Sequence, residues 1–188
     1  MRTLASFLMI SLDGYVEGRN GWDLDWHNVD EEFNEFAIAQ LDASDCLIFG
    51  RTTYQGMATY WPSSDAIASD GEVASRMNTK QKMVVSNTLD RPNPEWSNTR
   101  LIKGDPRAEL STLKQQSGNE LLVLGSSRLT ASLAEMGVLD ELRIIVNPVV
   151  LGEGHSLFGS ARQRTRLQLL SSRTFRSGNV LLTYKPLR

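Results

Sequence analysis

The sequence predicts an α/β protein with a mixed, mostly parallel sheet, helices on both faces and a C-terminal β-hairpin. Short apolar runs alternate with segments of helical periodicity along most of the chain, which is typical of parallel strands joined by helices. The last two apolar runs, 167–175 and 180–184, flank Arg176-Ser177-Gly178-Asn179, a hairpin turn. The length of 188 residues suits one domain with a sizeable core, so we expect a single domain over residues 1–188.

The composition is that of an ordinary soluble globular protein. Hydrophobic residues make up 40% of the chain and charged residues 22%, and the formal net charge is only -2, so no global field attracts nucleic acid or an anionic membrane. No apolar stretch approaches ~18 residues and no signal peptide is recognisable, which predicts a cytoplasmic protein. Cys46 lies in an apolar run and is expected to be a buried thiol, while His27 and His155 are too isolated to suggest a metal site.

The first predicted strand, residues 4–12, ends at Asp13-Gly14. Ligands of open α/β sheets collect outside the carboxyl ends of strands, so the Asp13 carboxylate is a candidate functional group as well as an ordinary turn former. Residues 17–26 are rich in Gly, Asn, Asp and Trp without periodicity, which predicts a loop over that edge, able to act as a lid. Asn28 and Glu31 form a capping box before an amphipathic helix.

Two further strands are each followed by a polar turn. Strand 46–49 precedes Gly50-Arg51-Thr52-Thr53, where Thr52 and Gln55 are predicted to cap a helix and the Arg51 charge lies beside its first amides. The polar segment 63–79 receives no assigned element. Strand 82–85 ends at Ser86-Asn87-Thr88. These turns resemble phosphate-binding positions.

The second half begins with a short strand at 101–102 and a helix capped by Asp105, with Pro106 at its first position. Strand 120–124 then meets Gly125, and Ser126 or Ser127 is predicted to cap a helix ending at Gly137. Because Gly125 allows a ligand to approach the backbone closely and helix amides favour anions, this turn suits a phosphate. It also fits an ordinary turn between a strand and a helix that binds no ligand. Strand 142–146 continues irregularly through 147–154.

A parallel sheet would gather the turns 50–53, 86–88 and 125–128 on one edge. A dinucleotide has that many polar parts to bind. With Arg51 or Ser86 near a ribose phosphate, the arrangement favours NADPH over NADH.

Five motifs in register are similar to the dihydrofolate reductase-like fold, and most to the C-terminal reductase domain of bifunctional riboflavin-biosynthesis deaminase-reductases. They are Ser11-Leu12-Asp13-Gly14, Gly50-Arg51-Thr52-Thr53-Tyr54, Val84-Val85-Ser86, Leu124-Gly125-Ser126-Ser127 and the segment 148–154. The resemblance covers nearly the whole chain.

The resemblance implies an NADPH site. The first turn would meet the pyrophosphate and adenosine, with Arg51 and Ser86 toward the 2′-phosphate, and 125–129 would cradle the pyrophosphate. The first strand and Asp13 would lie beside the nicotinamide under the lid loop. The implied cofactor contacts are Gly50, Arg51, Thr52, Thr53, Ser86, Gly125, Ser126, Ser127, Arg128 and Leu129.

The chain also departs from both relatives. Dihydrofolate reductases usually carry Gly-Gly where this chain has Gly125-Ser126, and their Trp-x-Leu-Pro lid motif is missing. The zinc-binding deaminase domain of the riboflavin enzymes has no counterpart. Neither relative's substrate is therefore inherited.

The resemblance implies a reductase of the dihydrofolate reductase or 5-amino-6-(5-phosphoribosylamino)uracil reductase type. Its substrate would be a small planar heterocycle, pterin-like or pyrimidine-like, which also needs a proton. The candidate donors are Asp13 and Glu32. Glu32 has the spacing of the substrate-binding carboxylate of dihydrofolate reductases, but it also suits a helix first turn.

The main alternative is a non-catalytic dinucleotide-binding or redox-sensing module, which would keep the three turns and need no acid. A flavin-dependent reductase is a further alternative. The resemblance also implies a homodimer, with the apolar final strands as a possible contact.

Overall fold

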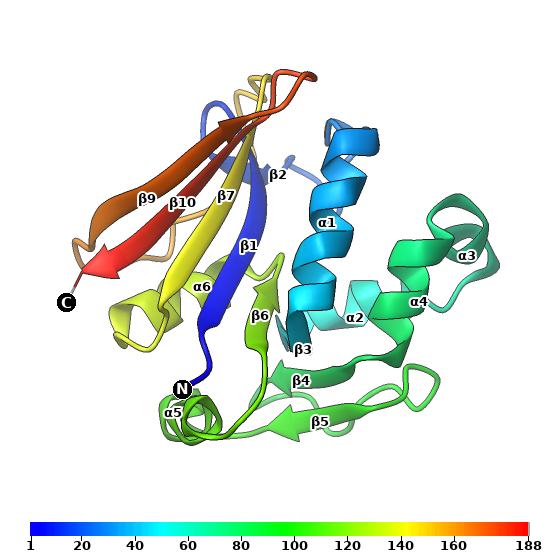
Figure 1. The fold of residues 1–188 in the computed structure, drawn as a ribbon, viewed down its shortest axis with the longest axis vertical. Helices are drawn as coiled ribbons and strands as arrows, with labels where there is room; N and C mark the ends of the chain where they lie inside the picture. Colours follow the sequence, from blue (N-terminus) through cyan, green and yellow to red (C-terminus); the bar gives the residue numbers. More distant parts are fainter. Residues whose placement is uncertain (188) are drawn as a thin grey trace.

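The computed structural model describes residues 1–187, which fold around an eight-stranded mixed sheet (Figure 1). The strand order is β5-β4-β3-β6-β1-β7-β10-β9; neighbours from β5 to β7 are parallel, and β10 is antiparallel to both β7 and β9. This confirms the mostly parallel sheet and the C-terminal hairpin. The strands are β1 Leu4–Ser11, β3 Ser44–Gly50, β4 Gln81–Val85, β5 Thr99–Ile102, β6 Glu120–Leu124, β7 Glu141–Asn147, β9 Arg166–Thr174 and β10 Val180–Leu187.

Helices cover both faces of the sheet, as predicted. Apolar residues of α1, α2 and α4 join one buried cluster, whereas those of α5 and α6 join the cluster on the other face. The helices are α1 Glu31–Ala43, α2 Arg51–Tyr60, α3 Ser64–Ser69, α4 Gly71–Thr79, α5 Pro106–Gln115 and α6 Ser127–Glu135. Within the part of the chain that the structure describes, no helix has the length and apolarity needed to cross a membrane.

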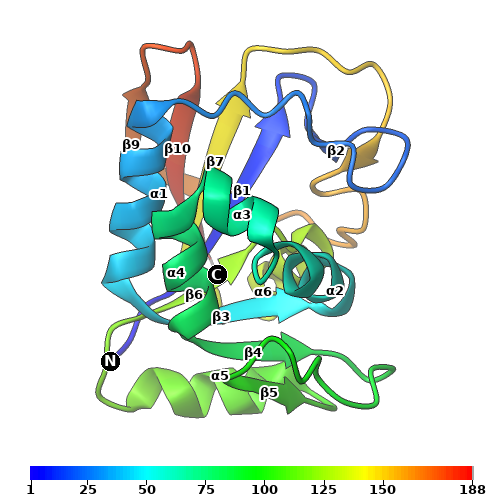
Figure 2. The same cartoon turned by 90° about the vertical axis from the view of Figure 1, so that its right-hand side faces the viewer.

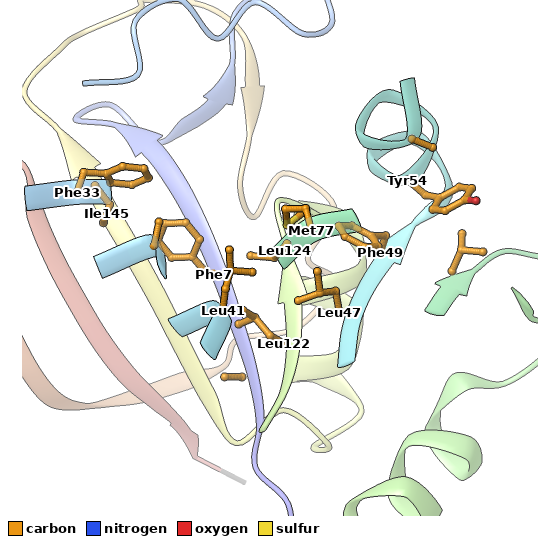
Figure 3. Packing of buried hydrophobic residues seen from close by; sticks show 14 of the residues in the cluster. Phe7, Phe33, Leu41, Leu47, Phe49, Tyr54, Met77, Leu122, Leu124 and Ile145 are labelled. Carbon is orange, nitrogen blue, oxygen red and sulfur yellow. The ribbon is translucent and has the colours of Figure 1, made fainter. Parts of the chain in front are cut away.

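Alternation along the central strand β1 divides the core between the two faces. Phe7 packs with Phe33 of α1 and Leu122 of β6 on one side (Figure 3), whereas Leu4 and Leu8 belong to the cluster on the other side. Successive strand residues point to opposite faces, and here both directions are apolar because both faces are covered. The middle of the sheet is therefore buried on both faces.

Two elements that were not predicted lie in the polar segment 63–79. Helices α3 and α4 occupy it; α3 begins after Ser63, whose hydroxyl accepts from the amide of Ala66 at 3.2 Å. Only Ala66, Ala74 and Met77 are buried there, so the apolar period is too sparse to stand out.

The helix caps also differ in part from the prediction. Asp30, and not Asn28, is the N-cap of α1 and accepts from the amide of Phe33 at 2.8 Å. Gly50 is the N-cap of α2 in place of Thr52. The Asp105 cap of α5 with Pro106 behind it is confirmed.

The strand order determines which turns meet. Because β3 and β6 are parallel neighbours in the sheet, the helices that follow them, α2 and α6, begin side by side at the carboxyl ends of these two strands (Figure 2). A second, two-stranded sheet formed by β2 Tyr15–Glu17 and β8 His155–Ser156 lies at the same end.

Candidate functional site

A cleft of about 850 Å³ opens at the carboxyl ends of the central strands. Its walls come from β1, from the first turns of α2 and α6, from the loop that follows β2, and from β8. Nine of the ten predicted cofactor contacts line it: Gly50, Arg51, Thr52, Thr53, Gly125, Ser126, Ser127, Arg128 and Leu129. The structure thus brings the first and last of the predicted turns into one site.

Helix α2 begins at this cleft without a side-chain cap. Its N-cap is Gly50, which has no side chain to accept from the first-turn amides. These amides and the helix dipole favour an anion. Arg51, the first residue of the helix, adds a full positive charge and is exposed.

Helix α6 begins opposite in the same way, although its N-cap is a serine. Ser126 makes no capping hydrogen bond, because its hydroxyl donates to the Leu124 carbonyl at 3.0 Å and accepts from the amide of Gly50 at 3.0 Å. Ser126 is the N-cap residue of α6, but its side chain does not accept from the first-turn amides, so the predicted side-chain cap is wrong. Its hydroxyl joins the two turns and leaves the first-turn amides of α6 without a side-chain cap.

Gly125 gives the turn 125–128 its shape. Its φ is +58°, in the left-handed region that disfavours side chains, and an added Cβ would lie 3.4 Å from Cγ2 of Thr53. The Gly125 amide donates to the Phe7 carbonyl of β1 at 3.0 Å, and its carbonyl accepts from the Thr53 hydroxyl at 3.2 Å. The turn is held tightly against both β1 and α2.

Ser86 is the predicted cofactor contact that does not line the cleft. Its nearly buried hydroxyl accepts from the amides of Thr88 at 3.1 Å and Leu89 at 3.0 Å. The hydroxyl thereby shapes the turn after β4, and the neighbouring Val85 reaches the cleft. The turn 86–88 therefore contributes to the cleft through the end of β4, at Val85, and not through the Ser86 side chain.

Asp13 lies outside the residues that line the cleft. Its carboxylate accepts from the amides of Leu151 at 3.1 Å and Gly152 at 2.7 Å. A hydrogen bond from the Ser11 side chain, together with these amides, lowers the pKa of Asp13 to about 2. The carboxylate holds the segment after β7 against the end of β1 and is ionised at neutral pH.

Glu32 lies outside the cleft lining as well, at the start of α1. It accepts from the amide of Arg176 at 2.9 Å and from Nη2 of Arg173 at 2.7 Å. The Arg176 amide and then the Arg173 side chain lower the pKa of Glu32 below its ordinary value. In this structure Glu32 ties α1 to the C-terminal hairpin.

The loop predicted as a lid forms part of the cleft wall, with Trp22 among the lining residues; its role as a lid stays a prediction. The Trp22 amide donates to Oε2 of Glu17 at 2.9 Å, and its φ of +66° is uncommon for a bulky residue. The Trp22 ring packs on Gly56 of α2, where any Cβ would overlap it. Trp22 was not predicted as a cleft residue, because the loop 17–26 has no periodicity that would single out one of its side chains.

Both histidines of the chain also line the cleft, although they are 128 positions apart and no local pattern links them. Nδ1 of His155 lies 2.9 Å from Oε1 of Glu17. Burial lowers the pKa of His27 to about 4, and its Nε2 has no hydrogen-bond partner within residues 1–187. His27 therefore stays neutral at neutral pH.

The lid loop is anchored directly after His27. The Asn28 amide donates to Oδ1 of Asn147 at 2.9 Å, and the Asn28 side chain donates to the Ser177 carbonyl at 2.9 Å. The Asn179 side chain donates back to the Asn28 carbonyl at 2.7 Å. His27 consequently sits at a fixed end of the loop, while Trp22 lies in its middle.

Comparisons with known proteins agree with this architecture. The uncharacterized protein YyaP of Bacillus subtilis (strain 168) is 32% identical over 180 residues, which cover 94% of this chain and 91% of YyaP. A protein assigned to riboflavin biosynthesis from Shewanella sp. PV-4 has a structure that matches with a TM-score of 0.74 at 25% identity, over 99% of both chains.

A more distant structure identifies the fold. The dihydrofolate reductase of Enterococcus faecalis, solved as a complex with NADP(H), matches with a TM-score of 0.65 at 15% identity, over 99% of this chain and 97% of the enzyme. The fold is thus dihydrofolate reductase-like. A model of the RibD C-terminal domain matches residues 2–181, so the chain belongs to the RibD C-terminal domain family.

Proposed function

We propose that this protein is an NADPH-dependent reductase that transfers hydride to a small planar heterocycle, pterin-like or pyrimidine-like. The observation that carries the proposal is the pair of helix N-termini, of α2 and α6, that open on one cleft without side-chain caps. Membership of the RibD C-terminal domain family supports a reductase. The cofactor of the Enterococcus faecalis structure, on the same fold, supports the choice of dinucleotide.

The cleft residues fit the phosphates of such a cofactor. Two sets of first-turn amides are free of side-chain caps, and both Arg51 and Arg128 stand beside them. Neither guanidinium takes part in an ion pair within the described residues. Helix amides and arginine are the groups that recognise phosphate.

The remaining walls suit the ring end of the cofactor. Leu8 and Met9 of β1, with Leu24 of the lid loop, supply apolar surface, which binds a flat ring and excludes water. When bound, NADPH supplies the hydride. Trp22 of the lid loop also lines the cleft, and its ring packs on Gly56 of α2.

The test is a titration with NADPH and with NADH of the unmutated protein and of Arg51→Ala. If Arg51 binds the 2′-phosphate, NADPH should bind clearly tighter than NADH, and the substitution should cost about 1 to 3 kcal/mol of NADPH binding and much less of NADH binding. The matched control is Arg107→Ala, because Arg107 is an exposed arginine on α5 that does not line this cleft. Equal affinities of the unmutated protein for the two cofactors would refute the NADPH assignment.

Turnover is then sought as loss of NADPH absorbance with dihydrofolate and with a ribosylaminopyrimidinone. The assignment of the proton donor to Asp13 or Glu32 stays a prediction, which Asp13→Asn and Glu32→Gln test at matched cofactor saturation. A donor lost by substitution should reduce turnover by roughly 100-fold or more. Unaffected turnover in both variants would remove these two carboxylates from the chemistry.

A further inference from the structure

We propose that His155, paired with Glu17, is the proton donor of the cleft, an inference that rests on the proposed function. His155 and Glu17 both line the cleft, and Nδ1 of the histidine lies 2.9 Å from Oε1 of the glutamate. No hydrogen bond engages Nε2 of His155 in the described chain, and its side chain is about half exposed, at 54%. The ring thus has one nitrogen against a carboxylate and the other free to meet a substrate.

The Glu17–His155 pair is held by the β2–β8 ladder and by a hydrogen bond from the Trp22 amide to Glu17. Glu17 and His155 are register partners in the β2–β8 ladder, so the backbone sets the distance between them. The second carboxylate oxygen of Glu17 accepts from the Trp22 amide at 2.9 Å. Glu17 is therefore a positioning residue that orients the imidazole and, through Trp22, links it to the lid.

The other titratable groups near this end of the sheet are less suitable donors. Asp13 and Glu32 have lowered pKa values, lie outside the cleft lining and are engaged by backbone amides. His27 lines the cleft, but burial keeps its ring neutral at neutral pH. His155 is the other imidazole that lines the cleft, and its Nδ1 lies against the Glu17 carboxylate.

The charges that face His155 come from several elements. Glu17 is on β2; Glu153 precedes β8 and pairs at 3.6 Å with Arg19 of the lid loop. Arg51 and Arg128 line the same cleft from α2 and α6. A cofactor that carries phosphate would neutralise the two arginines, leaving the Glu17 carboxylate as the charge in contact with the ring.

A bound NADPH would supply hydride to the carbon of a C=N or C=O bond of the heterocycle, and the substrate heteroatom would take a proton from His155. The Nε2–H bond of the His155 imidazolium breaks, and an N–H or O–H bond forms on the substrate heteroatom. The imidazole that remains is neutral, and solvent returns its proton after the product leaves.

The first test uses the small number of histidines. Protein labelled with ¹⁵N-histidine contains only two imidazoles, and His155→Gln should delete one set of signals and so assign both. We expect the His27 ring to stay neutral at neutral pH, because burial lowers its pKa to about 4. Addition of NADPH should shift the His155 signals, and Glu17→Gln should alter them in the protein without cofactor.

The second test is the pH profile of turnover at saturating NADPH. His155→Gln should retain NADPH affinity within about twofold and lose turnover by roughly 100-fold or more, together with the imidazole limb of the profile. Glu17→Gln should lose less turnover than His155→Gln. Circular dichroism checks that both variants fold.

The outcomes separate this inference from the proposed function. If NADPH binds but leaves the His155 signals unmoved, or if His155→Gln keeps the full pH profile, His155 is not the donor and the reductase assignment stands. If NADPH does not bind the unmutated protein, the proposed function fails and takes the inference with it.

Discussion

The Ser126 hydroxyl holds the two turns of the cleft together, so its loss should be felt in both. Ser126→Ala removes a nearly buried group that accepts from Gly50 and donates to Leu124. We expect a loss of about 1–3 kcal/mol in the free energy of unfolding, because a backbone amide and a carbonyl lose their partner. Urea denaturation of the variant and of the unmutated protein measures this loss in the free energy of unfolding. Ser127→Ala is the control, since no hydrogen bond of the Ser127 side chain is present in the described residues; an equal loss there would contradict this role.

The Asp13 carboxylate should make one segment sensitive to acid. Its pKa is lowered to about 2 in the folded protein, against about 3.9 in an unfolded chain. The stabilisation is therefore fully present above about pH 4 and is lost as the pH falls through 2. Asp13→Asn should unfold more easily than the unmutated protein at pH 6, and the difference should shrink toward pH 2.

Thermal unfolding at a series of pH values measures this. Asp65→Asn is a suitable control, because Asp65 is an exposed aspartate of α3 far along the chain from this segment. A pH-independent difference between Asp13→Asn and the unmutated protein would show that the charge is not what holds residues 151 and 152.

At the level of residues, the sequence indicated where polar groups gather but not which partner each would take. The turns 50–53 and 125–129 were recognisable because a glycine and hydroxyl residues follow an apolar run. The bond from Gly50 to Ser126 joins residues far apart in the chain, which no local pattern reveals. The Glu17–His155 pair escaped notice for the same reason.

Helix α2 and the lid loop are coupled at Gly56. A helix interior ordinarily gains about 1 kcal/mol from glycine to alanine, but here the new Cβ would overlap the Trp22 ring. Gly56→Ala should therefore displace the loop and increase amide hydrogen exchange across residues 17–26. The matched control is Gly71→Ala at the start of α4, where an added Cβ meets nothing within 4 Å.

Unchanged exchange in Gly56→Ala would show that the loop is held by Glu17 and Asn28 alone. An increase shared with Gly71→Ala would point to a general loosening of the fold. Mass spectrometry of peptides covering 17–26 distinguishes these results from local release of the lid.

At the level of elements, strong periodicity or a clear capping signal made a segment predictable. The eight strands of the main sheet, together with α5 and α6, follow their expected positions within a few residues. Helices α3 and α4 were missed because few of their residues are buried. The short strands β2 and β8 have no pattern of their own, since two or three residues cannot show alternation, and only long-range pairing forms them.

At the scale of the whole molecule, we propose that the protein forms a homodimer through the edge strand β9. Every residue of the edge strand β9 is exposed, including Leu169 at 52% and Leu170 at 48%, and Leu187 of β10 is exposed beside it. An apolar edge strand without a partner favours pairing with another chain. Sedimentation at micromolar concentration should therefore give a particle of twice the 21.0 kDa chain mass.

Leu169→Glu should shift that equilibrium to the monomer by placing charges in the contact. Ile67→Glu on α3 is the control, because Ile67 is equally exposed, at 56%, but lies far from β9. A monomer in the unmutated protein, or dissociation by Ile67→Glu alone, would contradict the proposed contact.

The position of β1 in the middle of the sheet has a consequence for synthesis. Its two neighbours, β6 and β7, pair residue 4 with residue 121 and residue 5 with residue 141. A ribosome adds ~5–20 residues per second, so the nascent β1 waits for its partners for on the order of ten seconds. During that time an apolar strand with two open edges is available to other chains and to chaperones. When translation is slow, or when many chains are made at once, the yield of folded protein should therefore depend on the sequence of β1. This dependence should be stronger than the burial of β1 in the finished protein suggests.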